Sequence, residues 1–351
     1  MHDAGHRVGM IYSPRRADRA FLTGIEEVKR HGVTVESQAL HPYAGLGPLW
    51  TSLERARRAS ADYDVTHLHG AWAGLVGRLS NSGARRCIVY SPHGGAFHPR
   101  PGGLYWFGRM GERVLARKTA AYVVASGYEE DRLRQIQGGR AEIVRIPHAR
   151  SIDPVPEGAR SSARTFGVVG RLVPEKRVDL AIDAFDRAAR DVDGATLVVV
   201  GEGAERASLT EDVARRGLAS SVSFMGYVED KHAIYSSFDV LLVPSDSEAF
   251  GLVAAEAQSF GIPTIAADSG GIREIVVDGE NGVLLPTRDA ASMARAMVDV
   301  ASDPSKYESL SKNAWAGATR RHAWDAVARD YVALYRRLVR TFEARSGQGE
   351  F

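Results

Sequence analysis

The sequence has a single cysteine among 351 residues, which is too few for an intrachain disulfide or for a metal site built from several thiolates. That residue, Cys87, lies in the apolar run CIVY, so we expect a buried thiol within a strand. No apolar run approaches the roughly 18 to 20 residues that cross a bilayer, and the N-terminus MHDAGHRVGMIYS lacks a signal-peptide core. These absences predict a cytoplasmic protein in a reducing compartment.

Two common phosphate-binding fingerprints are also absent, because the chain has neither a GKS or GKT loop nor a GxGxxG turn. The composition, 44% hydrophobic and 25% charged, is that of a globular protein whose length suits two domains. Residues 1–155 carry 22 Lys and Arg against 14 Asp and Glu, whereas the remainder carries 23 against 29. The basic first half predicts an anionic partner, such as a lipid carrier or the inner membrane face; solvated arginines on helices are the alternative.

Apolar runs alternate with amphipathic ones, which is typical of parallel sheets with helices on both faces. The expected strands are residues 7–13, 33–40, 64–70, 87–93, 120–126, 142–148, 165–170, 196–201, 222–226, 239–245, 263–267 and 282–286. The aperiodic stretch 151–164 predicts a linker. We therefore predict an α/β fold of two tandem Rossmann-like, doubly wound domains facing a cleft, residues 1–155 and 156–323, followed by a helix over 324–351.

Ligands of open parallel sheets bind outside the carboxyl ends of the strands, so the loops there are the candidate sites. After the strand that ends at Gly170, Arg171 and Lys176 place two cations where they reach one anion. The backbone around Tyr227 and Val228 follows another strand and is available to a planar base. The alternative is that Arg171 and Lys176 are ordinary solvated charges of a loop and bind no ligand.

A further loop, SEAFGLVAAEA (247–257), places two glutamates around small and apolar residues. We expect Glu248 in a strand-to-helix loop and Glu256 on the helix, with the amides of Phe250, Gly251 and Leu252 at the helix N-terminus, a site for phosphate. A carboxylate at position 256 is costly without a partner, and sugar or ribose hydroxyls are suitable partners. The alternative is that both glutamates are ordinary solvated carboxylates.

Together these loops resemble those of the family 4 retaining glycosyltransferases, which have the B-type fold of two Rossmann-like domains. The matching residues are Glu248-AFGLVAA-Glu256, the following AQSFGIPTIAADSGGIREIVVDGENGVLLP, and GRLVPEKRVDLAIDAF upstream. The stretch SPHGGAFHPRPGGLYWFGRMGERVLARKTAAYVVASGYEEDRL is similar to the acceptor-binding domain of capsule and exopolysaccharide members. The resemblance implies that the last helix packs back on the first domain.

The resemblance also implies roles in the second half. Arg171 and Lys176 would hold the donor diphosphate and neutralise it as it leaves. Glu248 would contact hydroxyls of the transferred sugar, residues 250–252 would contact phosphate or sugar, and Glu256 would hold the ribose diol. One preorganised contact of this kind is worth about 3 kcal/mol, so the mechanism requires no metal.

Metal-using sugar transferases instead need an acidic DxD pair. The chain contains Asp191-Val192-Asp193, which we place in a helix-to-strand loop far from the strand carboxyl ends. It also contains Asp246-Ser247-Glu248, whose glutamate is better used in the glutamate motif.

In the first half, His93 ends a strand before Gly94-Gly95, and the resemblance implies that it lies beside the donor sugar. His67 and His69 alternate along a strand and point to one face. The two histidines suggest a metal site, but the sequence offers no third ligand at a suitable spacing. We therefore expect His69 to line the cleft. Ser126 ends the next strand and would face the cleft too.

Two departures from the family pattern weaken the acceptor assignment. The loop after the first strand, YSPRRADRAF, lacks the usual glycine pair, and Arg15 would substitute for amide contacts there. IPHARSID places His148 and Ala149 where Asn-Gly is common.

The leading hypothesis is a retaining transferase that moves a sugar from a nucleoside diphosphate sugar to the hydroxyl of a small-molecule or lipid-linked acceptor. The product would be a surface polysaccharide, a glycolipid or a natural-product glycoside. We expect no cofactor, no metal and no nucleic acid, and we favour a UDP-sugar over a GDP-sugar because the base loop offers mainly backbone. The alternatives are a non-hydrolysing sugar-nucleotide epimerase and a catalytically silent sugar-nucleotide binding protein.

Overall fold

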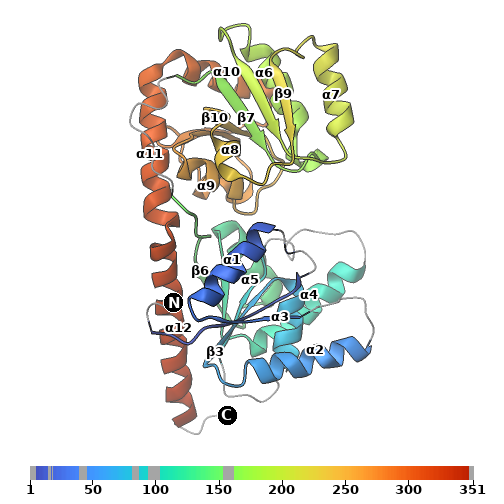
Figure 1. The fold of residues 1–351 in the computed structure, drawn as a ribbon, viewed down its shortest axis with the longest axis vertical. Coiled ribbons are helices and arrows are strands. Elements are labelled where there is room, and N and C mark those ends of the chain that lie inside the picture. The colour runs from blue at the N-terminus through green and yellow to red at the C-terminus, as the bar shows by residue number, and fades with distance from the viewer. Residues whose placement is uncertain are drawn as a thin grey trace. The chain divides into compact units, whose positions relative to one another are not determined.

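The computed structural model describes residues 5–14, 17, 19–38, 46–80, 87–93, 103–152 and 162–347. Contacts divide the chain into two units, Met1–Ile146 with Ala328–Phe351, and Pro147–Val327. Each unit alternates parallel strands with helices (Figure 1), and each of the twelve strands predicted from the sequence is confirmed. Among the described helices, none combines the length and apolar character needed to cross a bilayer.

The second unit contains one six-stranded parallel sheet in the order β12-β11-β10-β7-β8-β9. Its strands are β7 (Thr165–Val169), β8 (Thr196–Val200), β9 (Val222–Gly226), β10 (Val240–Val243), β11 (Thr264–Ala267) and β12 (Gly282–Leu285). The chain starts at β7 in the middle and extends first to one side and then to the other. The boundary between β7 and β10 is therefore the topological switch point, outside which doubly wound sheets bind their ligands.

Helices cover both faces of this sheet (Figure 1). They are α6 (Val178–Ala188), α7 (Arg206–Arg215), α8 (Lys231–Tyr235), α9 (Leu252–Ser259), α10 (Ala290–Ser302) and α11 (Pro304–His322), with 3-10 turns η4 (Pro174–Lys176) and η5 (Gly270–Glu274). Buried side chains of α6, α7 and α10 form one core with alternate residues of the strands. On the other face, α9 packs against β10 and β11.

The strands of the first unit form two parallel sheets rather than one. They are β1 (Gly9–Tyr12) and β2 (Thr34–Ser37) in one sheet, and β3 (Val65–His69), β4 (Cys87–Ser91), β5 (Ala121–Val124) and β6 (Glu142–Arg145) in the other. Tyr63 packs against Gly9 at the start of β1, where a Cβ atom would overlap its ring, and Arg7 stacks on the same ring.

The helices of the first unit are α1 (Arg19–Arg30), α2 (Leu46–Ala59), α3 (Ala71–Ser80), α4 (Gly103–Leu115), η3 (Ala116–Lys118) and α5 (Gly127–Gln137), together with α12 (Trp324–Gly347) from residue 328 onwards. Leu334 and Leu338 of α12 are buried, and the Cys87 thiol lies 3.5 Å from the Leu338 carbonyl oxygen. The predicted burial of Cys87 is confirmed.

One charged pair is buried in the core of the first unit. The Arg78 guanidinium donates two hydrogen bonds to the Glu112 carboxylate, at 2.5 and 2.9 Å, and its side chain is almost fully buried. Tyr122 donates a third hydrogen bond to Glu112 at 2.6 Å, and the ring of Tyr90 lies under the guanidinium. Because both charges are hydrogen-bonded, burial of the pair is tolerated.

Candidate functional site

The centre of the candidate site is a contact between the loops that follow β7 and β10. The Lys176 ammonium donates to Oε1 of Glu248 at 2.5 Å, and both side chains are largely buried. Since β7 and β10 are neighbours in the sheet, this contact lies at the topological switch point. Two residues that the sequence predicts as site residues, 72 positions apart, are thus brought together.

The loop that carries Glu248 is fixed by backbone contacts on both sides. The Gly271 amide donates to the Glu248 carbonyl oxygen at 2.7 Å, and the Asp246 amide donates to the Glu175 carbonyl oxygen at 2.9 Å. The left-handed Gly270, φ 63°, passes so close to Glu248 that any side chain there would overlap its carbonyl. The position of Glu248 is therefore set by the fold rather than by its own side chain.

The N-terminus of α9 follows directly, as predicted. Gly251 is its N-cap residue, with φ 92°, and a Cβ atom there would lie 2.6 Å from Ile272 Cδ1. Glycine supplies no capping side chain, so the amides of the first turn are left for another acceptor. Phe250 is buried and anchors the turn, whereas Leu252 is 46% exposed.

The ring of Phe250 also packs on residues near the two ends of the second unit in sequence. His148 lies edge-on to this ring at 5.2 Å between centroids, and His322 does so at 5.8 Å. The His322 ring nitrogen Nδ1 lies 3.3 Å from the carbonyl oxygen of His148. His148, which stands where Asn is common in the family, therefore packs its imidazole on Phe250, between Glu248 and Glu256 in the sequence.

Arg171 follows Gly170 directly and is exposed at the end of β7. The Gly170 amide donates to the Val200 carbonyl oxygen at 3.0 Å, which holds the loop against β8. At Gly201 any Cβ atom would overlap the Gly170 carbonyl, and at Gly203 it would overlap the Leu172 backbone. The second glycine loop therefore serves close backbone packing beneath the cationic loop.

Glu256 has protein partners that sequence reasoning missed. Its Oε1 accepts from the Lys231 ammonium at 2.7 Å, and its Oε2 accepts from the Tyr235 hydroxyl at 2.7 Å. The Arg150 guanidinium nitrogen Nε lies 3.7 Å from Oε1, and burial lowers the pKa of Arg150. The need for a partner was visible in the sequence, but its identity was not, because α8, which carries Lys231 and Tyr235, and the segment with Arg150 are both distant in sequence from Glu256.

Two predicted base-contacting residues lie in the loop between β9 and α8. Tyr227 is 71% exposed, which is unusual for a tyrosine, and Val228 is half-buried.

The loop between α6 and β8 holds Asp191 and Asp193. It lies at the amino ends of the strands, whereas Lys176 lies at their carboxyl ends. The DxD sequence is thus a loop remote from the strand carboxyl ends.

In the first unit, three histidines gather at the carboxyl ends of β3 and β4. His69 Nδ1 lies 2.9 Å from His93 Nε2, and the ring of His67 lies 4.1 Å from that of His69. Burial and the neighbouring histidines lower the pKa of His67 to about 2, and burial also lowers the pKa of His93. Among the described residues, no group of three His, Cys, Asp or Glu side chains is arranged to hold a metal ion.

The remaining predicted residues of the first unit receive less support. Ser126 is fully buried, and its hydroxyl accepts from the Glu129 amide as the N-cap of α5, so its burial is explained by capping rather than by an acceptor. Arg15 lies outside the described residues, as do Gly94 and Gly95.

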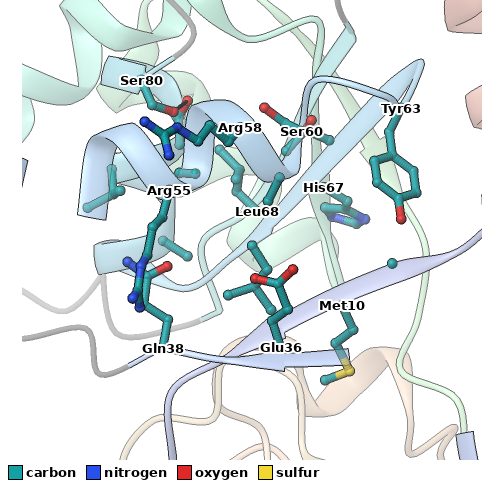
Figure 2. Close-up of a pocket in the computed structure, with 18 of the residues that line it drawn as sticks. Met10, Glu36, Gln38, Arg55, Arg58, Ser60, Tyr63, His67, Leu68 and Ser80 are labelled. Carbon is teal, nitrogen blue, oxygen red and sulfur yellow. Dashed lines mark hydrogen bonds between the residues drawn. The ribbon is translucent and has the colours of Figure 1, made fainter. Parts of the chain in front are cut away.

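A cavity of about 990 Å³ lies in the first unit between the β1–β2 sheet and the edge of β3 (Figure 2). Met10 and Glu36 line one wall, and His67, Arg55 and Arg58 line the other. The cavity therefore carries charged side chains on both walls among apolar ones, and all of its lining residues belong to the first unit.

Comparison with solved structures identifies the class of fold. The chain is similar to HepE of Anabaena in complex with UDP and glucose, with a TM-score of 0.71 and 24% identity over 91% of this chain and 89% of that one. At this identity the likeness shows the fold alone, which is the B-type glycosyltransferase fold of two Rossmann-like domains.

Sequence comparison then identifies the family. Residues 150–316 match the family described as glycosyl transferases group 1, and residues 1–149 match the glycosyl transferase 4-like domain. The chain is 31% identical to a D-inositol 3-phosphate glycosyltransferase of Geodermatophilus obscurus over 87% of its length and 75% of that protein. The chain therefore belongs to the glycosyl transferases group 1 family.

A second relative is matched over a shorter region. An exopolysaccharide phosphotransferase of Streptomyces coelicolor is 33% identical over 66% of this chain. The chain spans only about a quarter of that relative, 25% of its length.

Proposed function

We propose that the protein is a retaining, metal-independent glycosyltransferase that moves a sugar from a nucleoside diphosphate sugar to an acceptor hydroxyl. The observation that carries the proposal is the Lys176–Glu248 pair at the switch point of the second unit. A cation and a carboxylate held together there suit the two ends of such a donor: the diphosphate and the hydroxyls of the sugar.

The proposed mechanism is electrostatic. As the bond from the anomeric carbon to the diphosphate breaks, negative charge grows on the leaving oxygen beside Lys176, Arg171 and the first-turn amides of α9. The acceptor oxygen forms its bond to the anomeric carbon on the same face, and its proton passes to the departing phosphate. One preorganised contact of this kind contributes about 3 kcal/mol, so the two cations and the helix N-terminus together supply the stabilisation that a metal gives elsewhere.

Donor recognition is assigned to the same unit. Glu256 would bind the ribose diol, because its carboxylate is already held in place by Tyr235 and Lys231. We favour UDP-sugars, since the loop around Tyr227 presents an exposed ring and backbone groups to the base. HepE, which shares the fold, binds UDP and glucose.

The acceptor is proposed to bind the first unit. Its basic charge, with 22 Lys and Arg against 14 Asp and Glu over residues 1–155, supports an acceptor that carries phosphate, including a lipid-linked one at the inner membrane face. Roles in surface polysaccharide, glycolipid or natural-product glycoside synthesis fit such an acceptor.

The test is a transfer assay with UDP-, GDP- and ADP-sugars and a panel of acceptors, with and without a chelator, followed by NMR of the product anomer. We expect the transferred sugar to have the same anomeric configuration in the product as in the donor. We also expect the chelator to leave the rate of transfer unchanged. An inverted anomer or loss of activity on chelation would contradict it. Conversion of the donor sugar without any acceptor would instead indicate an epimerase.

A further inference from the structure

The histidines at the carboxyl ends of β3 and β4 form one connected cluster. The planes of His69 and His93 lie within 13° of each other, and the distance from His69 Nδ1 to His93 Nε2, 2.9 Å, is that of a hydrogen bond. When both rings are neutral, one of these two nitrogens carries the proton and the other accepts it. The tautomer of His93 is therefore coupled to that of His69.

The neutral state of the pair follows from its surroundings. Burial lowers the pKa of His93, and burial and the charge on His93 lower that of His69 to about 4. His67 packs on His69, and the groups that His67 itself contacts, Ser91, Tyr331 and Tyr335, are uncharged near neutral pH. Because one proton is shared, the second nitrogen of His93, Nδ1, carries a proton when Nε2 accepts from His69 and lacks one when Nε2 donates.

His67 packs against His69 and is itself held by two hydrogen bonds. Its Nε2 lies 2.9 Å from the Ser91 hydroxyl, and its Nδ1 lies 2.6 Å from the Tyr335 hydroxyl of α12. Its ring packs on that of His69, two residues along β3 and on the same face. His69 is therefore confined between a fixed imidazole and its partner.

The backbone of His93 supports a functional role. His93 and Arg177 are the non-glycine residues with positive φ among those described, both at 51°. A residue with a side chain rarely adopts this conformation unless the surrounding structure holds it there, and such positions cluster at active sites. Arg177 lies next to Lys176, so both positions adjoin candidate site residues.

We propose that His69 is a positioning residue for His93, which fixes the orientation and the protonated nitrogen of the imidazole presented to the transferred sugar. This inference rests on the proposed function and on the role that the family resemblance implies for His93 beside the donor sugar. His69 thus acts through His93 rather than on the substrate.

The test compares His69→Ala, His69→Asn and the exposed His31→Ala control. The asparagine amide lies near the place of the imidazole Nδ1 and both donates and accepts, so it retains the hydrogen bond. In protein labelled with 15N-histidine, spectra of the His93 ring, assigned with His93→Gln, report which nitrogen is protonated. We expect one tautomer in the wild type, His69→Asn and His31→Ala, and a mixture in His69→Ala.

Kinetics give the second readout. We expect His69→Ala to lower kcat by about 10- to 100-fold, in line with other outer partners of functional histidines, with UDP affinity unchanged and most activity restored in His69→Asn. A mixture of tautomers in the wild type, or a His93 spectrum unchanged in His69→Ala, would overturn the inference. Because the spectra need no substrate, absence of sugar transfer in the wild type would count against the proposed function alone.

Discussion

The Lys176 ammonium lies 2.5 Å from Oε1 of Glu248 and joins the loops of two adjacent parallel strands. Each side chain neutralises the other while the donor is absent. A bound nucleoside diphosphate sugar would exchange this contact for two better ones, with Lys176 on phosphate and Glu248 on a sugar hydroxyl.

Removal of Lys176 is expected to impair catalysis more than binding. Lys176→Ala should lower kcat by roughly a hundredfold or more, since it removes a charge that acts on the leaving diphosphate, while the UDP dissociation constant changes by a much smaller factor. Steady-state kinetics with UDP titrations measure both. Arg187→Ala, an exposed cation on α6 paired with Asp183, is the control. Unchanged turnover in Lys176→Ala would count heavily against the electrostatic mechanism.

Glu256 is expected to govern nucleotide affinity. Glu256→Gln should weaken UDP binding by about 10- to 100-fold, because a hydrogen bond to a charged group contributes about 1.5–3 kcal/mol. Tyr235→Phe, which keeps the ring but removes the hydroxyl that orients the carboxylate, should weaken it less. Calorimetric titration gives both values, with the exposed Glu211→Gln as control. Equal UDP affinity in the wild type and in Glu256→Gln would show that Glu256 does not bind the nucleotide.

Gly201 is expected to tolerate no side chain. Gly201→Ala places a methyl group on the Gly170 carbonyl oxygen and forces φ 132° on a residue that disfavours it. We expect a loss of more than about 2 kcal/mol in unfolding free energy. Gly24→Ala, in α1 with open space around its Cβ, should instead be neutral or stabilising. Urea unfolding gives the unfolding free energy of both variants. Equal stability of Gly201→Ala and Gly24→Ala would show that Gly201 is not required for the close approach to Gly170.

Acid is expected to destabilise the first unit through His67. Its folded pKa is about 2, well below the value of about 6.5 in an unfolded chain. The unfolded state therefore binds the proton first, so the stability from neutral His67 is present above pH 6.5 and is lost as the pH falls below it, by about 1.4 kcal/mol per pH unit.

The measurement is the urea midpoint of unfolding between pH 7.5 and 5.5. His67→Gln, which keeps polar atoms near Ser91 but does not titrate, should show a shallower decline below pH 6.5 than the wild type. His31→Gln should decline like the wild type, because His31 is exposed. Parallel declines in wild type and His67→Gln would show that burial of this imidazole is not a source of the pH dependence.

The alternation of apolar runs was sufficient to predict each strand that the described residues form. In the second unit this is because strands of a parallel sheet buried on both faces are rich in Val, Ile and Leu. The alternation also located Lys176 and Glu248, since loops at strand carboxyl ends follow from strand assignment. The pattern did not predict that Lys176 and Glu248 are in contact, because the contact requires β7 to lie next to β10. The order of strands in a sheet is not encoded in local sequence.

The same limit explains the residues that were missed. Lys231, Tyr235 and Arg150 meet at Glu256 only after folding, and nothing in their local sequence marks them. In the first unit, the separation of β1 from β3 was also missed. At the start of β1, Gly9 and Arg7 pack against Tyr63, a tertiary contact between segments far apart in sequence that the local pattern does not indicate.

The central claim is that Arg171, Lys176 and the N-terminus of α9 bind the diphosphate of the donor. The most direct measurement is calorimetric titration of UDP into the wild type and into the double variant Arg171→Ala/Lys176→Ala. The account predicts saturable binding at one site per chain in the wild type and affinity at least about tenfold weaker in the double variant, measured at a temperature where both proteins are folded. Equal affinity in the two proteins, or no UDP binding by the wild type, would contradict it.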